Sequence, residues 1–313
     1  MKKKGFRKRR VKDPGYGGFD SQKIERIIND DGTFNVKHIN RKASFRDLYH
    51  DLINVSWSRF FLFTFLGYLI INLGFAGIYY LIGVESIGLN SQSFFYDFVQ
   101  CFYFSTQTFT TVGYGSLSPQ GGMTSLVASI EAFVGLLAFS FATGLFYGRF
   151  SRPVPSIFYS DKILLRPLKK GRAIMFRIAN EHTNTLINVN TNIILVLKTI
   201  NDDGSHGVTP YQTTLERNSI SFLSLTWTIV INIDEDSPLF DKTDEEIKNT
   251  EGEFIVHMSY FDDTFSQDLH QQKSYLLKDL VINEKFVKAY GANNNGQNVL
   301  DYEKLNLTEK IDE

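Results

Sequence analysis

Two long apolar runs divide the chain into a middle segment with almost no charge and two flanking segments rich in charge. Phe60 to Ile82 is a run of 23 residues without a charged side chain, and Met123 to Phe146 is a run of 24 interrupted only by Glu131. At about 1.5 Å per residue, a helix of either length crosses the hydrocarbon layer of a bilayer. No Lys or Arg occurs between Phe60 and Gly148. A domain of this size in water would carry basic residues on its surface. We therefore predict transmembrane helices at about residues 58–83 and 121–150.

A third apolar stretch lies between these runs and is too short to cross. The sequence "SFFYDFVQCFYFSTQTFTT", which starts at Ser93, predicts a re-entrant helix at about residues 94–109. "TVGYG" follows it, from Thr111 to Gly115. A second Gly-Tyr-Gly occurs in "PGYGGFD", from Pro14 to Asp20, in a polar segment that no such helix precedes. The string alone fits an ordinary turn, and its position after a half-helix between two spans is what indicates a pore.

The segment from Thr111 to Gly115, which we call the filter segment, has the chemistry of a potassium filter. A dehydrated K⁺ needs several oxygen ligands at once, and backbone carbonyls supply them when several chains surround one axis. Gly113 and Gly115 tolerate the backbone angles that this arrangement requires, and Thr111 adds a hydroxyl. We predict that the carbonyls of Thr111, Val112, Gly113 and Tyr114 bind K⁺, that no cofactor is needed, and that the protein is a homotetramer.

The flanking segments are polar before the first span and β-rich after the second. Residues 1–40 are basic at the start and contain no apolar core, so we expect a cytoplasmic arm. A nucleic-acid-binding arm is the alternative, but no recognisable motif supports a nucleic-acid partner. Residues 41–57 predict an amphipathic interfacial helix, which leads into a transmembrane pore domain at residues 58–152. Short β-rich runs then predict a β-sandwich at residues 153–290, with a C-terminal tail at residues 291–313.

The chain resembles the inward-rectifier potassium channels of the prokaryotic KirBac group over about residues 40–290. The likeness rests on "TTVGYG" at the filter, "FSRP" at the end of the second span, and "FRIAN", "IDEDSPL" and "SQDLH…KSY" in the β-rich part. It implies a membrane α plus all-β fold: two transmembrane helices with a re-entrant pore helix and selectivity filter, then a cytoplasmic immunoglobulin-like β-sandwich, in a homotetramer. It also implies a K⁺-selective channel of the bacterial inner membrane, gated at the cytoplasmic helix bundle and modulated by anionic lipids, and not an enzyme. Basic residues outside both spans agree with cytoplasmic termini.

A stripe on the second span is the candidate lining of the lower pore. Leu136, Phe139, Thr143 and Tyr147 recur at spacings of 3, 4 and 4 and share one helical face. By pattern alone this face packs against the first span, but the resemblance favours pore lining, with Tyr147 as the gate. Phe139 occupies the position where strongly rectifying relatives carry an acid, so we expect weak or no polyamine rectification.

Glu131 and Gln107 are candidate supports of the filter segment. Glu131 lies about 100° from the stripe, which favours hydrogen bonding behind the filter over direct attraction of ions. Gln107 takes a position where many relatives have Glu. Gly135 and Gly144 are hinge candidates, although close helix packing explains them equally well.

Basic residues near the cytoplasmic interface are candidates for binding anionic lipids. A positive-inside anchor explains them without a specific ligand, and the resemblance adds a regulatory role. The candidates are Arg41, Lys42, Arg46, Arg149, Arg152 and Lys162. The competing function is a non-conducting, membrane-anchored β-sandwich that binds a lipid or solute and needs only a monomer.

Overall fold

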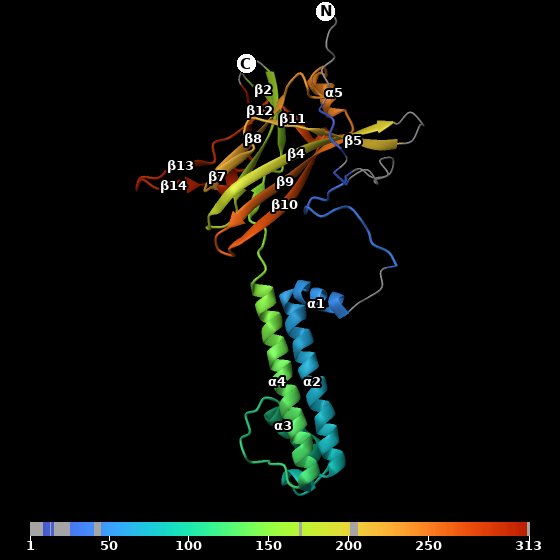
Figure 1. Ribbon diagram of the computed structural model, residues 1–313. Coiled ribbons are helices and arrows are strands. Elements are labelled where there is room, and N and C mark those ends of the chain that lie inside the picture. The colour runs from blue at the N-terminus through green and yellow to red at the C-terminus, as the bar shows by residue number, and fades with distance from the viewer. Residues whose placement is uncertain are drawn as a thin grey trace, which may run out of the picture. The chain divides into compact units, whose positions relative to one another are not determined.

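The computed structural model describes residues 9–12, 14–15, 26–40, 45–168, 171–200 and 206–311, without the side chains of residues 45–48, 50, 200 and 206. The chain forms two compact units (Figure 1). The pore unit is Asn40–Arg152, and the β unit combines Met1–Ile39 with Pro153–Glu313. The boundary after Arg152 coincides with Pro153 and Pro155, which cannot continue a helix.

The pore unit is helical. α1 is Phe45–Asn54, α2 is Trp57–Ile82, the 3₁₀ turn η1 is Val84–Ile87, α3 is Phe94–Phe109 and α4 is Gly122–Phe150. α2 and α4 run side by side, and α3 packs against both (Figure 1). α2 ends at Gly83, whose φ of 111° favours glycine. α3 begins after Ser93, whose hydroxyl accepts a hydrogen bond from the amide of Tyr96.

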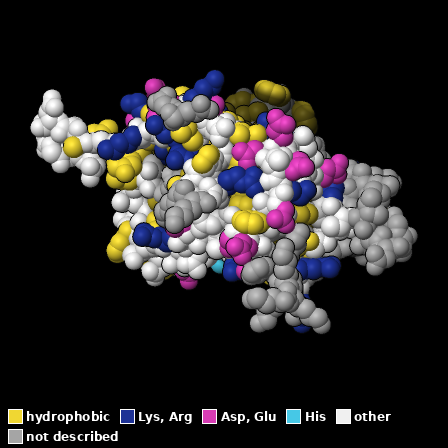
Figure 2. Space-filling view, turned by 90° about the horizontal axis from the view of Figure 1, so that it is seen from above, with side chains coloured by type: hydrophobic (Ala, Val, Ile, Leu, Met, Phe, Trp, Pro, Cys, Tyr) yellow, Lys and Arg dark blue, Asp and Glu magenta, His cyan; other side chains and the backbone are white. Residues whose placement is uncertain are grey.

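The two units differ in what they expose. In the most apolar 18-residue window of each long helix, only 11% of residues are buried in α2 and 17% in α4. The core helix of a soluble protein would be mostly buried, so length and exposure together fit membrane spans. On the visible face of the β unit, by contrast, Lys and Arg side chains lie among Asp and Glu side chains (Figure 2).

The β unit is a sandwich of two sheets. One has the strand order β11-β2-β3-β8-β6, with β1 also paired to β3, and the other has the order β10-β9-β4-β5, with β7 also paired to β4. A short helix, α5 (Asp244–Lys248), connects β8 to β9. The strands are β1 Ile157–Tyr159, β2 Ile163–Leu168, β3 Gly171–Asn180, β4 Leu186–Ile200, β5 His206–Gln212, β6 Thr214–Leu215, β7 Ser219–Leu223, β8 Thr226–Ile233, β9 Gly252–Asp262, β10 Gln267–Leu276 and β11 Leu280–Ile282.

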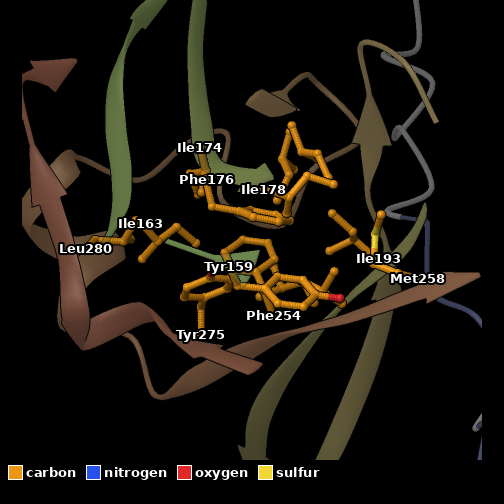
Figure 3. Packing of buried hydrophobic residues seen from close by; sticks show 14 of the residues in the cluster. Tyr159, Ile163, Ile174, Phe176, Ile178, Ile193, Phe254, Met258, Tyr275 and Leu280 are labelled. Atoms are coloured by element: carbon orange, nitrogen blue, oxygen red, sulfur yellow. The ribbon is translucent and has the colours of Figure 1, made fainter. Parts of the chain in front are cut away.

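The core of the β unit lies between the two sheets. Alternate residues of each strand point inward, as the twofold period of a strand requires. Ile174 and Phe176 of β3 and Phe254 and Met258 of β9 thereby belong to one buried cluster (Figure 3). The ring of Phe176 also packs against that of Tyr275, with 5.0 Å between the centroids.

Part of the N-terminal arm docks on the edge of β5. The amide of Gln212 donates to the carbonyl of Arg9 (2.9 Å), and the amide of Val11 donates to the carbonyl of Pro210 (3.2 Å). Arg9 also forms an ion pair with Asp236 (3.4 Å). This short pairing satisfies backbone groups that an edge strand would otherwise leave open.

A second stretch of the arm is buried on the outer face of the sheet that contains β9. Ile27 and Ile28 are only 4% and 0% exposed. The amide of Ile27 donates to Oε1 of Glu253 (2.7 Å), and the hydroxyl of Ser274 donates to Oε2 (2.7 Å). A buried carboxylate therefore connects the arm to β9 and β10.

The chain beyond residue 290 is also paired. β12 (Glu284–Phe286) pairs with β15 (Thr308–Lys310), and β13 (Tyr290–Ala292) pairs with β14 (Asn298–Leu300). Leu305 is fully buried beside Ala179 and Ala289. We expected a tail from residue 291 onward, and the structure instead shows this segment folded onto the β unit as far as residue 311.

Candidate ion pathway

The filter segment has an alternating backbone conformation. The φ angles of Thr111, Gly113 and Gly115 are positive, at 59°, 53° and 82°. Val112 and Tyr114 between them are not among the residues with positive φ. When left-handed and ordinary backbone conformations alternate in this way, successive carbonyls point toward the same side of the strand. A carbonyl ladder needs this geometry.

The start of the filter segment is tied to the end of α3. The amide of Thr111 donates to the carbonyl of Thr108 (3.1 Å), and the amide of Val112 donates to the carbonyl of Gln107 (3.0 Å). α3 thus ends directly beside the start of the filter segment. The partly negative C-terminus of a helix at this position favours a cation nearby.

The remainder of the filter segment makes few contacts within one chain. In the described part of the chain, the amides of Gly113, Tyr114 and Gly115 donate to no backbone carbonyl. The side chain of Tyr114 is 79% exposed, and that of Val112 is 54% exposed. A strand in this conformation therefore needs neighbours that one chain does not supply.

Glu131 forms a buried polar cluster that joins α2, α3 and α4. Tyr79 of α2 donates to its Oε2 (2.6 Å), and Ser105 of α3 hydrogen bonds to its Oε1. Ser105 also contacts Oδ1 of Asn72 on α2 (3.0 Å). All four side chains are fully buried. Glu131 is therefore engaged in hydrogen bonds to side chains of α2 and α3.

Gln107 lies at the last turn of α3, as its place in the sequence predicts. Its Oε1 is buried and has no hydrogen-bond partner among the described residues. A buried carbonyl without a donor is costly, so this oxygen marks a position where a group from outside the chain is needed.

The two hinge candidates have different surroundings. A Cβ atom on Gly135 would lie 2.0 Å from the carbonyl oxygen of Phe109, whereas a Cβ on Gly144 would meet nothing within 4 Å. Gly135 is therefore required for close packing of α4 on α3. Gly144 is free of that constraint within the chain.

The stripe on α4 does not pack against α2. Leu136, Phe139 and Tyr147 are 56%, 73% and 75% exposed, and Thr143 is exposed as well. An apolar stripe left open along a membrane helix is available either to lipid or to a neighbouring chain.

Two of the lipid candidates are already engaged by protein groups. Arg149 donates from its guanidinium to the carbonyls of Leu52 (2.7 Å), Ile53 (2.8 Å) and Val55 (2.7 Å). Lys162 donates to the hydroxyl of Thr308 (2.6 Å).

Of the other lipid candidates, Arg152 is the one described with an exposed side chain, and it hydrogen bonds to Asn54. Arg41 and Lys42 lie outside the described residues, as does the side chain of Arg46.

Two family models match the chain. The model for the inward rectifier potassium channel C-terminal domain matches residues 159–313, and an ion channel model matches residues 67–152. The inward rectifier potassium channel Kirbac3.1 of Paramagnetospirillum magnetotacticum is 30% identical over 284 residues, which cover 90% of this chain and 94% of that protein. This chain belongs to the inward rectifier potassium channel family.

Two further proteins show weaker similarity to the chain. The ATP-sensitive inward rectifier potassium channel 12 of Gallus gallus is 22% identical over an alignment 334 positions long, which covers 95% of this chain and 76% of that protein. A solved structure of the sporulation control protein Spo0M from Bacillus subtilis matches 39% of this chain and 49% of its own, with 10% identity and a TM-score of 0.21.

Membership in this potassium channel family confirms the predicted family and fold class: two apolar helices followed by an all-β domain. The family consists of ion channels and not of enzymes, and its members are membrane proteins.

Sequence reasoning missed several residues that hold the helices of the pore unit together. It singled out Glu131 but not its partners Asn72, Tyr79 and Ser105, whose only signal is that polar side chains are sparse in an apolar segment. It also missed Gly148, where a Cβ would lie 3.1 Å from the hydroxyl of Tyr49. These contacts depend on how the helices are rotated against one another, which no local pattern encodes.

Proposed function

We propose that the protein is a K⁺-selective channel in which four copies of this chain surround one pore. The observation that carries this proposal is the alternating backbone of Thr111, Gly113 and Gly115 at the end of a half-helix between two spans. In a ring of four such strands, the carbonyls of Thr111, Val112, Gly113 and Tyr114 replace the water shell of K⁺.

Features of the single chain support a tetramer. An open, mostly apolar crevice of about 740 Å³ runs between α2 and α4, with Phe63, Phe139 and Phe141 among its lining residues. Other chains would bury the apolar walls of this crevice and the exposed side chain of Tyr114. They would also supply a donor for the unpartnered Oε1 of Gln107. A ring of four is the arrangement that fills these surfaces and completes the ion ligands together.

The lower pathway follows from the exposed stripe on α4. Leu136, Phe139, Thr143 and Tyr147 line it, and the four copies of Tyr147 form the gate at the cytoplasmic helix bundle. Phe139 supplies no carboxylate, so the channel rectifies weakly or not at all by polyamine block. Gly144, which has open space around it, is the candidate hinge for opening.

Anionic lipids modulate the channel from the cytoplasmic side of the bacterial inner membrane, where both termini lie. Among the described candidates, Arg152 is the one that supports lipid contact, because its side chain is exposed. Arg41, Lys42 and Arg46 remain candidates from the sequence. Arg149 and Lys162 make protein contacts instead.

The test is ion flux from liposomes that contain the purified protein, and the chain offers its own matched control. Gly113→Ala alters a positive-φ glycine of the filter segment, and Gly15→Ala alters a positive-φ glycine of the other Gly-Tyr-Gly. We expect K⁺ to pass and Na⁺ to be excluded, Gly113→Ala to abolish the flux, and Gly15→Ala to preserve it. Equal K⁺ and Na⁺ flux, or a non-conducting monomer on cross-linking, would establish a different function.

A further inference from the structure

We propose that Glu131 carries its proton and acts as a hydrogen-bond donor that holds the pore helix α3 in register with α2 and α4. In this arrangement Ser105 passes the hydrogen bond on to Asn72. The protonation follows from the hydrogen-bond geometry alone, and only its consequence for conduction rests on the proposed function.

The orientation of Asn72 is fixed first. Its Nδ2 donates to the carbonyl of Tyr68 (2.8 Å), and a backbone carbonyl can only accept. Its Oδ1 therefore faces Ser105, at 3.0 Å. An amide oxygen also only accepts, so the hydroxyl of Ser105 must supply the proton of this contact.

Ser105 has one proton and is in contact with two acceptors. Once that proton is directed to Asn72, the contact between the Ser105 hydroxyl and Oε1 of Glu131 needs a proton from Glu131. Tyr79 supplies the proton of the third contact, to Oε2 (2.6 Å). A neutral Glu131 satisfies all three contacts with one proton each, whereas an ionised Glu131 leaves two oxygens facing each other without a proton.

The surroundings favour the neutral acid as well. Asn72, Tyr79, Ser105 and Glu131 are each 0% exposed. The segment from Phe60 to Gly148 contains no Lys or Arg to neutralise a carboxylate. A buried carboxylate without a cation is costly, and a protonated one with satisfied hydrogen bonds is not.

The other titratable groups near the cluster do not change the assignment of one proton to each of its three hydrogen bonds. On α3, Asp97 is engaged near the start of the helix, where Ser91 and the amide of Gln92 donate to it. α3 also carries the buried Cys101 and the exposed Tyr96 and Tyr103. The titratable groups of α2 are Tyr68, Tyr79, Tyr80 and, in its first turn, Arg59. Apart from Glu131 and Tyr147, α4 carries only Arg149 at its far end, which is bonded to carbonyls at and just beyond the end of α1.

The cluster positions the filter segment through a second contact one turn further along. Glu131 and Gly135 are four residues apart on α4, and their partners Ser105 and Phe109 are four residues apart on α3. The two pairs fix the last turn of α3. The amides of Thr111 and Val112 donate hydrogen bonds to carbonyls of this turn. Loss of the donor at Glu131 would let this turn shift and would widen the carbonyl ring.

Glu131→Gln and Glu131→Ala test the proposal in the full-length protein. Gln keeps a donor for Ser105 and an acceptor for Tyr79, so flux and K⁺ selectivity should stay within about twofold of the wild type. Ala removes both hydrogen bonds and should lower K⁺-over-Na⁺ selectivity by at least about tenfold, since about tenfold is the effect expected for one buried hydrogen bond. Ser105→Ala should resemble Glu131→Ala.

Infrared spectroscopy of the purified protein gives a readout that does not depend on conduction. The difference between wild type and Glu131→Gln should contain the carbonyl stretch of a protonated carboxylic acid, shifted in deuterated water. A carboxylate band in its place would overturn the proposal, as would a Gln variant that fails to fold or loses selectivity as Ala does. If the infrared band is present but no variant conducts, the proposed function fails and the protonation stands.

Discussion

A Cβ atom at Gly135 would lie 2.0 Å from the carbonyl oxygen of Phe109, where α4 crosses the last turn of α3. The obstacle is backbone and not a movable side chain, so any residue larger than glycine must push the two helices apart. The filter segment begins two residues after Phe109, and a displacement there reaches the ion ligands.

We predict that Gly135→Ala destabilises the protein by about 1–3 kcal/mol, as overpacking of a close contact does. The measurement is the thermal unfolding midpoint in detergent together with K⁺ flux. Gly144→Ala is the matched control, because nothing lies within 4 Å of its Cβ position and alanine favours a helix. Equal stability of the two variants would show that α4 does not approach α3 this closely.

Arg149 is predicted to hold α1 in place. It caps carbonyls at and just beyond the C-terminal end of α1, which a helix leaves without partners, and its guanidinium lies 4.4 Å from the ring centroid of Trp57. Lys cannot reproduce this planar set of donors. Arg149→Lys should therefore speed hydrogen exchange in residues 51–56.

Arg152→Gln is the control for this prediction. Its side chain is exposed and bonds to the side chain of Asn54 rather than to a backbone carbonyl. The substitution should therefore weaken the response of flux to anionic lipid and change backbone exchange in residues 51–56 less than Arg149→Lys does. If Arg149→Lys instead alters only the lipid response, Arg149 is a lipid ligand and its contacts to α1 are unimportant.

Phe139→Asp is predicted to create polyamine block. It places four carboxylates around the pore of a tetramer, where they attract a polycation that the aromatic ring does not. Spermine applied to the cytoplasmic side should then inhibit outward current at least about tenfold more strongly than in wild type. Phe139→Asn is the neutral control, and inhibition of it to the same degree would place the polyamine site elsewhere.

The stability of the β unit should depend on pH through Glu253. Burial raises the pKa of this carboxyl above its ordinary value of 4.5, against the lowering effect of hydrogen bonds from Ser274 and Ile27. The native state then keeps a proton that the unfolded chain has lost, so the free energy of unfolding falls as pH rises from about 4.5 through the native pKa.

Urea unfolding of the full-length protein in detergent, followed by β-sheet circular dichroism at about pH 5 and about pH 8, measures this effect. Glu253→Gln should reduce the difference between the two midpoints. An unchanged difference would assign the pH dependence to groups other than Glu253. His257 is not one of them, because burial lowers its pKa and its contribution to stability rises with pH.

The sequence predicted the membrane helices and the pore helix because their signals are lengths and charges that any bilayer imposes. The filter segment was predicted from its two glycines, whose conformational freedom is visible in the sequence. The positive φ of Thr111 was not predicted, because threonine seldom adopts a positive φ and only the alternation with Gly113 requires it.

Contacts between elements that are distant in the sequence could not be predicted from local sequence patterns. The sequence indicates only that Arg149 is a cation near the membrane interface. The position of α1 in the structure shows that it caps backbone carbonyls. Ile27 and Ile28 lie in a polar arm whose composition predicts no docking, yet a hydrophobic patch on Val196 and Ile255 buries them. In each case the decisive partner is far away in sequence.

The central claim is that four filter segments meet around K⁺, and the most direct test is a density map of the assembled protein prepared in Rb⁺, whose anomalous signal marks the ions. We predict a tetramer with a column of Rb⁺ on its axis, enclosed by the carbonyls of Thr111 to Tyr114. An assembly in which these strands lie apart, or in which Rb⁺ is absent from the axis between them, would contradict the account.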